Sequence, residues 1–350
     1  MSQKQFSFVP PLRVQSIDQD MDSVPGLFIQ DVCLSLQDRR SIDACRNLPP
    51  SRWRQICRAT SDKMCTLVIY LDNVEKKIYA AACYLYHDFF HPYAPFKTVA
   101  LRFFNNFRVE PLLENALSHY VPFWKEITPD KLRDLAHSIK PTWVKTHPVR
   151  YDRRCGNSVS LNRKTNWING TILSMRLPVD SMTISIDKCD LENVVTFFEN
   201  IGSIFKFSCD LVGINWTKTM HSLMQRTVDT IIEKFVPTDG GWFRVGQPLT
   251  REQIKRLVLK CEMSNKSVTV LVNSQGFRKV SELYDFLNID KHYSKKEVVK
   301  EVLYAFRKGT PLELTVRRSS CHVSFRWNTK RQQKRQQKSL KRPRPSGRTC

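Results

Sequence analysis

Residues 182–208 read MTISIDKCDLENVVTFFENIGSIFKFS, and this stretch decides the fold class. Met182–Ile186 alternates larger apolar and small polar residues, which is typical of a strand with one buried face. Leu191–Asn200 carries apolar residues at helical spacing, and Gly202 follows it as a residue common just past a helix end. Ile204–Ser208 again favours a strand. The stretch therefore predicts a β-α-β unit.

The same alternation continues toward the C-terminus. Thr250 with Gln253 forms a capping box that predicts the start of a helix. Ser294 with Glu297 repeats this signature and predicts another helix, which ends before Gly309. Further helices are expected at 222–235, 250–260 and 294–306, and further strands at 242–245, 268–272, 312–316 and 322–325. We therefore expect residues 171–327 to form an α/β recognition domain.

The strand centres of this domain show an approximate repeat. Centres near Ile184, Lys206, Thr269 and Leu314 are separated by 22, 63 and 45 residues, close to one, three and two steps of about 22. That step lies within the range of leucine-rich repeats, but the consensus asparagine is missing and a strand near Trp242 does not fit. An irregular α/β array fits these positions equally well. Either arrangement would present a binding surface.

The N-terminal half predicts a mixture of helices and strands, so the expected class is α+β or α/β. Three short amphipathic helices are expected before residue 60, and a β-branched strand at Thr66–Tyr70 follows them. Thr128 precedes Pro129 and predicts the cap of a further helix. The expected order is a flexible leader at 1–20, a helical module at 21–60, a mixed strand and helix region at 61–143, and a polar linker or loop at 144–170.

The chain is strongly basic, with 56 Lys and Arg against 33 Asp and Glu and a formal net charge of +23. Such a balance favours a polyanionic partner. Residues 328–350 contain nine basic residues and no acidic residue, so they predict a disordered basic tail. A solvated tail without a dedicated partner is the alternative. The candidate contacts to a nuclear import receptor or to nucleic acid are Lys330, Arg331, Lys334, Arg335, Lys338, Lys341, Arg342 and Arg344.

Cysteine usage and the absence of certain motifs favour an intracellular protein without chemistry of its own. The 11 cysteines include no CxxC pair, and no apolar signal segment opens the chain, so we expect reduced thiols in the nucleus or cytoplasm. No run approaches the ~18 apolar residues of a membrane helix. Cys83, His87 and His91 have a helical metal-ligand spacing, but no fourth ligand is evident and we predict no metal site. Phosphate-binding glycine motifs are missing, so we expect neither a cofactor nor enzymatic activity.

Residues 21–58 resemble an F-box. The segment MDSVP at 21–25 and the apolar residues after it resemble the opening helix of that module, and Trp53 resembles the tryptophan near its end. Leu27 departs from the family pattern, which often has an acidic residue there, and Pro49-Pro50 interrupts the approach to Trp53. With the long α/β region behind it, the chain is similar to the nematode-expanded F-box-like proteins, which have an F-box-associated C-terminal domain.

The resemblance implies a function and a set of contact residues. In that family the helical module docks on the Skp-type adaptor of a cullin ubiquitin ligase, and the C-terminal domain selects the protein substrate. The implied adaptor-facing residues are Val24, Pro25, Phe28, Ile29, Val32, Leu36 and Trp53.

The expected function is thus a substrate-recognition subunit with an unknown target and no membrane contact. The alternative is a nuclear, nucleic-acid-associated basic protein without enzymatic activity. Aromatic residues beside basic ones, at Arg102-Phe103-Phe104 and Phe325-Arg326-Trp327, would then stack on single-stranded bases. Alternating aromatics in strands more commonly belong to the core, which weighs against that use.

Overall fold

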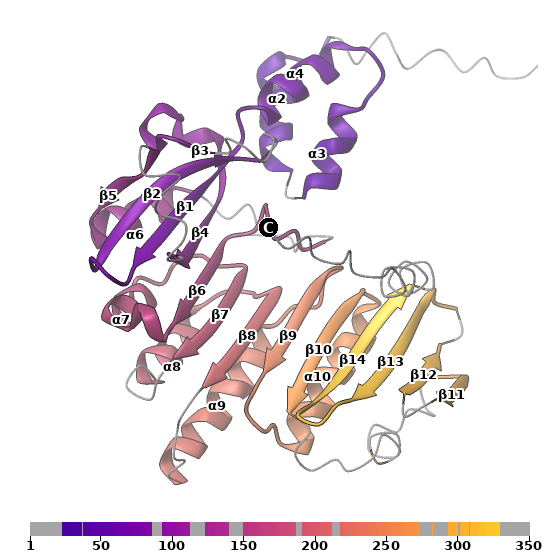
Figure 1. Ribbon diagram of the computed structural model, residues 1–350. Coiled ribbons are helices and arrows are strands. Elements are labelled where there is room, and N and C mark those ends of the chain that lie inside the picture. The colour runs from indigo at the N-terminus through magenta and orange to yellow at the C-terminus, as the bar shows by residue number, and fades with distance from the viewer. Residues whose placement is uncertain are drawn as a thin grey trace, which may run out of the picture.

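The computed structural model describes residues 23–36, 38–85, 93–112, 123–139, 150–186, 191–211, 218–273, 282, 293–299, 302–307 and 309–329. These residues form eight α-helices and one 14-stranded mixed sheet (Figure 1). The expectation of a mixed α/β fold is therefore confirmed. The predicted leader at 1–20 and every predicted contact residue of the basic tail, from Lys330 onward, lie outside the described residues.

Three helices form the helical module and are grouped beside one end of the sheet (Figure 1). They are α2 (Gly26–Ser35), α3 (Arg39–Arg46) and α4 (Arg52–Ser61). Side-chain caps explain two of the three starts, because they satisfy backbone N–H groups that lack a partner within the helix. Asp38 accepts a hydrogen bond from the amide of Ser41, and Ser51 accepts one from the amide of Arg54.

Seven parallel strands form the main part of the sheet, and each is added beside the one before it along the chain. The strands are β1 (Cys65–Asp72), β4 (Phe104–Pro111), β6 (Ser158–Asn162), β7 (Ser181–Ile186), β8 (Lys206–Leu211), β9 (Gly241–Val245) and β10 (Val268–Asn273). Next to β1 the sheet continues antiparallel, through β2 (Lys77–Tyr84), β3 (Tyr93–Ala94) and β5 (Lys125–Ile127). The 3₁₀ turns η1 (Phe96–Thr98) and η2 (Leu101–Phe103) precede β4.

Helices cover one face of this parallel sheet (Figure 1). They are α6 (Pro129–Ser138), α7 (Asn166–Ser174), which follows η4 (Arg163–Thr165), α8 (Leu191–Asn200), α9 (Lys218–Lys234) and α10 (Arg251–Ser264). Along β9, the side chains of Phe243 and Val245 are buried while Arg244 between them is exposed, which is the alternation of a strand with one covered face. Phe243 lies 5.6 Å from Phe207 and 5.2 Å from Phe235, measured between ring centroids. The predicted capping box at the start of α10 is confirmed.

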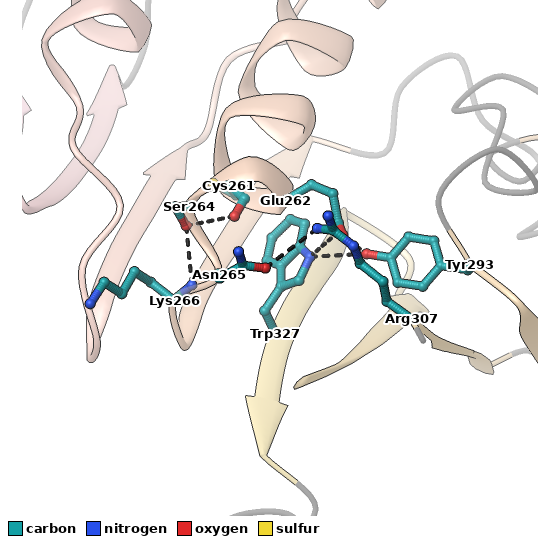
Figure 2. Close-up of polar contacts among 8 residues, drawn as sticks. All are labelled: Cys261, Glu262, Ser264, Asn265, Lys266, Tyr293, Arg307 and Trp327. Carbon is teal, nitrogen blue, oxygen red and sulfur yellow. Dashed lines mark hydrogen bonds and ion pairs between the residues drawn. The ribbon is translucent and has the colours of Figure 1, made fainter. Parts of the chain in front are cut away.

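The C-terminal end of the sheet is antiparallel and is fastened to α10 by a buried polar cluster. Its strands are β11 (Lys295–Val299), β12 (Val302–Phe306), β13 (Leu312–Arg318) and β14 (His322–Thr329), of which β14 pairs with β10. Figure 2 shows Glu262 of α10 between Tyr293, Arg307 and Trp327. Trp327 donates to Glu262 Oε2 at 2.7 Å, Arg307 donates to Oε1 at 3.3 Å, and Tyr293 donates to Oε2. Both carboxylate oxygens are thus engaged, so we assign this cluster to stability.

Three details differ from the sequence expectations. The helix predicted at 294–306 is wrong, because β11 and β12 pair there as an antiparallel hairpin and β12 pairs further with β13. The segment 144–170, expected as a polar linker or loop, contains β6 and the start of α7 among its described residues. Strand β14 extends through Thr329, two residues into the segment expected as a tail.

Buried polar side chains link the N-terminal ends of successive parallel strands. Thr66 on β1 donates to Asn106 Oδ1 on β4 at 2.8 Å. Asn157 Oδ1, just before β6, accepts from the amide of Phe107 at 3.0 Å, and Asp180, just before β7, accepts from the amide of Asn157 at 2.7 Å. The bonds from the amides of Phe107 and Asn157 satisfy backbone groups, and the bond between Thr66 and Asn106 satisfies two buried side chains.

Candidate docking site on the helical module

Leu27 and Phe28, here called the apolar pair, lie on the surface at the start of α2. Their exposed fractions are 72% and 55%. The opposite side of the helix carries Ile29 and Cys33, which are fully buried and four residues apart. Because an α-helix turns by about 100° per residue, Leu27 points about 200° away from Ile29. The module therefore cannot bury Leu27 and Ile29 together.

The structure places the seven residues assigned by the F-box resemblance in three environments. Pro25 and Phe28 are exposed, and Ile29 is fully buried, so Ile29 is core rather than surface. The other four are partly buried. Val24, Leu36 and Trp53 pack against the module core, whereas Val32 does not. Sequence reasoning missed Leu27, because it stands where the family pattern differs and only its exposure marks it.

A small, thiol-rich core holds the module together. Its buried residues are Ile29, Cys33, Ile42, Cys57, Met64, Leu85 and Cys155. The Cys33 thiol lies 3.7 Å from the carbonyl oxygen of Cys57. Burial, aided by neighbouring Cys57 and Cys45, raises the pKa of Cys33 to about 12, so this thiol stays protonated and unreactive near neutral pH.

Two carboxylates fasten α3 to the sheet region. Asp152 accepts the amide of Arg39, the first residue of α3, at 2.9 Å. Asp38, which caps the same helix, forms an ion pair with Arg150 at 3.2 Å. Negative side chains are favourable at a helix N-terminus, where backbone N–H groups point outward. The module is thus held in a defined orientation, and the apolar pair is presented on a fixed support.

The aromatic residues considered for base stacking are buried. Phe103 is 7% exposed and Phe104 is 6% exposed, while Phe325 and Trp327 are 0% and 2% exposed. Rings inside the core cannot stack on a nucleic-acid base without unfolding the sheet. Nucleic-acid binding therefore remains a prediction for the basic tail, and so do import-receptor binding and a nuclear or cytoplasmic location.

No arrangement for metal chemistry occurs among the described residues. Cys83 lies on strand β2 instead of the helix that its spacing with His87 and His91 presupposes, and both histidines fall outside the described part. The nine described cysteines are all free, and Cys321 alone of these nine is exposed. In the part of the chain that the structure covers, no helix combines the length and apolar character needed to cross a membrane.

Comparison with known proteins adds no assignment to this geometry. No family model, no curated protein and no solved structure matches the chain. A functional proposal therefore has to rest on the exposed surface of the module and on the architecture behind it.

Proposed function

We propose that this chain is an F-box-like substrate-recognition subunit of a cullin-type ubiquitin ligase. In this proposal the helical module binds a Skp-type adaptor, and the α/β region binds an unknown protein target. The exposure of the apolar pair Leu27–Phe28 carries the proposal. Neighbouring large apolar side chains at the exposed start of a helix are typical anchors for a hydrophobic groove on a partner.

The energetics favour such an anchor. Complete burial of one large apolar side chain contributes about 1.5–3 kcal/mol relative to leaving it in water. A few such residues usually supply most of the affinity of a protein interface. Helix α2, which carries the pair, has no side-chain cap of its own, but its Cys33 contacts Cys57 on the capped helix α4. This packing keeps the pair in place before binding, which lowers the entropic cost of forming the complex.

The α/β region is, in this proposal, an irregular leucine-rich-repeat-like array that carries the target site. Two observations support this reading. The seven parallel strands follow one another in chain order with helices on one face, which is the arrangement of a solenoid rather than of a doubly wound sheet. Asn106, Asn157 and Asp180 also link successive strands at equivalent ends, a role that asparagines can fill between stacked repeats.

Direct binding of the purified full chain to a purified Skp-type adaptor tests the adaptor proposal. We expect the double variant Leu27→Ser, Phe28→Ser to bind at least about tenfold more weakly than the wild type, because both anchors are removed. Its free energy of unfolding should change by less than about 0.5 kcal/mol per residue, since both side chains are exposed.

The matched control is Leu259→Ser, Met263→Ser on α10. These residues are 45% and 59% exposed, so the control removes another exposed apolar pair from a helix. It should bind the adaptor like the wild type. Absence of binding by the wild-type chain would contradict the proposal, and so would an equal loss in both double variants.

A further inference from the structure

A cavity of about 590 Å³ is lined by three lysines that come from elements other than α2. Lys97, Lys125 and Lys131 are here called the lysine cluster. This volume lies within the range of small-molecule sites. Phe96 and Ile127, each 9% exposed, supply apolar lining. The full lining consists of Phe96, Lys97, Lys125, Glu126, Ile127, Thr128 and Lys131.

Local structure brings the three lysines together from three elements. Lys97 lies on η1, directly after the buried Phe96. Lys125 shares a face of β5 with Ile127, because residues two apart in a strand point to the same side. Lys131 is in the first turn of α6, where its amide donates to Thr128 Oγ1 at 3.2 Å.

None of the three lysines forms an ion pair with a described residue, although the carboxylate of Glu126 also lines the cavity. The two nearest carboxylates in the sequence have other partners: Glu126 pairs with Lys77 at 3.4 Å, and Asp130 pairs with Arg133 at 2.9 Å. The ammonium group of Lys97, close to that of Lys125, lowers the pKa of Lys125, and Lys131 acts in the same direction. Three cations therefore converge at the rim of an apolar cavity, and their mutual repulsion would be relieved by a bound anion.

We propose that the lysine cluster binds a phosphate monoester carried by a small apolar or aromatic group. A phosphate monoester carries about −1.5 to −2 charges at neutral pH, and lysine binds phosphate readily as a point charge. A carboxylate carries one charge and would leave more of the repulsion in place. A nucleic-acid strand spreads its phosphates along its length, whereas this cluster concentrates three cations at one cavity. The apolar lining would receive the organic part of the ligand.

Calorimetric titration of the full chain with phenyl phosphate at about 0.15 M ionic strength, where the Debye length is about 8 Å, tests this inference. Phenyl phosphate combines the dianion with a ring, whereas inorganic phosphate and phenol each supply one half. We expect phenyl phosphate to bind more tightly than either. The double variant Lys97→Gln, Lys131→Gln should bind it at least about tenfold more weakly, which is the effect of losing a charge-assisted hydrogen bond.

The matched control is Lys255→Gln, Lys295→Gln, which makes the same change in net charge at exposed positions on α10 and β11. Its affinity should stay within about twofold of the wild type, because exposed charges beyond one Debye length are screened. No saturable binding by the wild-type chain would overturn the proposal. An equal loss in both double variants would also overturn it, since net charge would then explain the binding.

Two sources could present this phosphate, and a peptide arm separates them. If a phosphotyrosine peptide binds more tightly than phenyl phosphate and its unphosphorylated form does not bind, the result supports the site and identifies the ligand as a modified protein side chain. Preference for phenyl phosphate supports the site and identifies a free organic phosphate. The cluster lies on η1, β5 and α6, so these results are independent of adaptor binding by α2.

Discussion

The helical module and the sheet region, which comprises β1 to β14 with α6 to α10, are stabilised by cores of different size and chemistry. The main core of the sheet region has 55 buried residues, of which three are cysteines. The module core has seven buried residues, and three of these are also cysteines. The sheet region therefore depends on aliphatic and aromatic packing, whereas the module depends strongly on thiols.

The module core is also not self-contained. Met64, Leu85 and Cys155 belong to it but lie outside α2, α3 and α4. Small cores bury too little apolar surface to be stable alone, so contacts borrowed from a neighbour matter more for the module than for the sheet region. The candidate docking site thus lies on the region expected to open more easily, and its presentation depends on attachment to the sheet.

The largest difference between the two regions should appear after truncation of one core residue in each. Phe243→Ala removes a ring that contacts two other phenylalanines, and we expect it to cost about 3–5 kcal/mol. Ile42→Ala in the module should cost about 2–4 kcal/mol. Hydrogen exchange measured by mass spectrometry should show faster exchange throughout the chain for Phe243→Ala, and only at residues 26–61 for Ile42→Ala.

Equal acceleration of both regions by Ile42→Ala would contradict this distinction, because it would make the module and the sheet region one cooperative unit. Val298→Ala is a suitable control for the effect of truncating a side chain outside the core, since Val298 is 61% exposed on the edge strand β11. It should leave exchange in both regions unchanged.

The architecture of the sheet region could be predicted from the sequence wherever a local sequence signal agreed with the tertiary environment. Thr250 and Gln253 predict α10 because the capping box and the buried helix face act together. Ser294 and Glu297 form the same kind of capping signature, but the residues that follow form β11, which pairs with β12, and β12 pairs further with β13. Pairing across the sheet therefore outweighs a local helix start, and a single sequence window does not contain that information.

The candidate sites could be predicted from the sequence only in part. Apolar spacing predicted the helix α2, whereas Phe28 and Ile29 were implied as contacts by the F-box resemblance. That resemblance does not show which side of this helix faces inward, so Ile29 was assigned to the surface and Leu27 was overlooked. The lysine cluster has no sequence signature, because Lys97, Lys125 and Lys131 come from a 3₁₀ turn, a strand and a helix. The strand and helix positions that bring them together are set by long-range contacts.

The buried thiol of Cys33 should make the stability of the module depend on pH. Burial raises the pKa of Cys33 from its usual value of 9.0 to about 12, so above pH 9 the unfolded state loses a proton that the folded state retains. Stability from this group is complete below about pH 9 and falls as the pH approaches 12. At pH 10.5 the loss should be about 2 kcal/mol. Urea unfolding of the full chain under reducing conditions, followed by hydrogen exchange at residues 26–61, measures this loss.

Cys33→Val separates this effect from other groups that titrate at high pH. The variant lacks the thiol, so its stability should fall less between pH 8 and 10.5 than that of the wild type. Cys209→Val, in the sheet core, removes a thiol without touching the module and should leave the pH dependence of the module unchanged. If the stability of the wild type and of Cys33→Val falls equally with pH, the buried thiol of Cys33 does not cause the pH dependence of the module.

The smallest of the three effects should come from the connection between the two regions. Asp152 accepts from the amides of Arg39 and Arg154 through separate oxygens. Asp152→Asn removes the negative charge and leaves one acceptor oxygen for these two amides, and the loss of one charged hydrogen bond should cost about 1.5 kcal/mol. Exchange at α3 should then rise roughly tenfold while exchange in the sheet region stays constant.

Asp130→Asn is the matched control, because it removes an exposed carboxylate near the start of α6 rather than α3. If the control accelerates exchange at α3 as much as Asp152→Asn does, the loss of one negative charge explains the effect, and the hydrogen bond between Asp152 and the amide of Arg39 does not. If only Asp152→Asn does so and adaptor affinity falls with it, the orientation of α3 contributes to presenting Leu27 and Phe28. The two regions would then be coupled in function although their cores are separate.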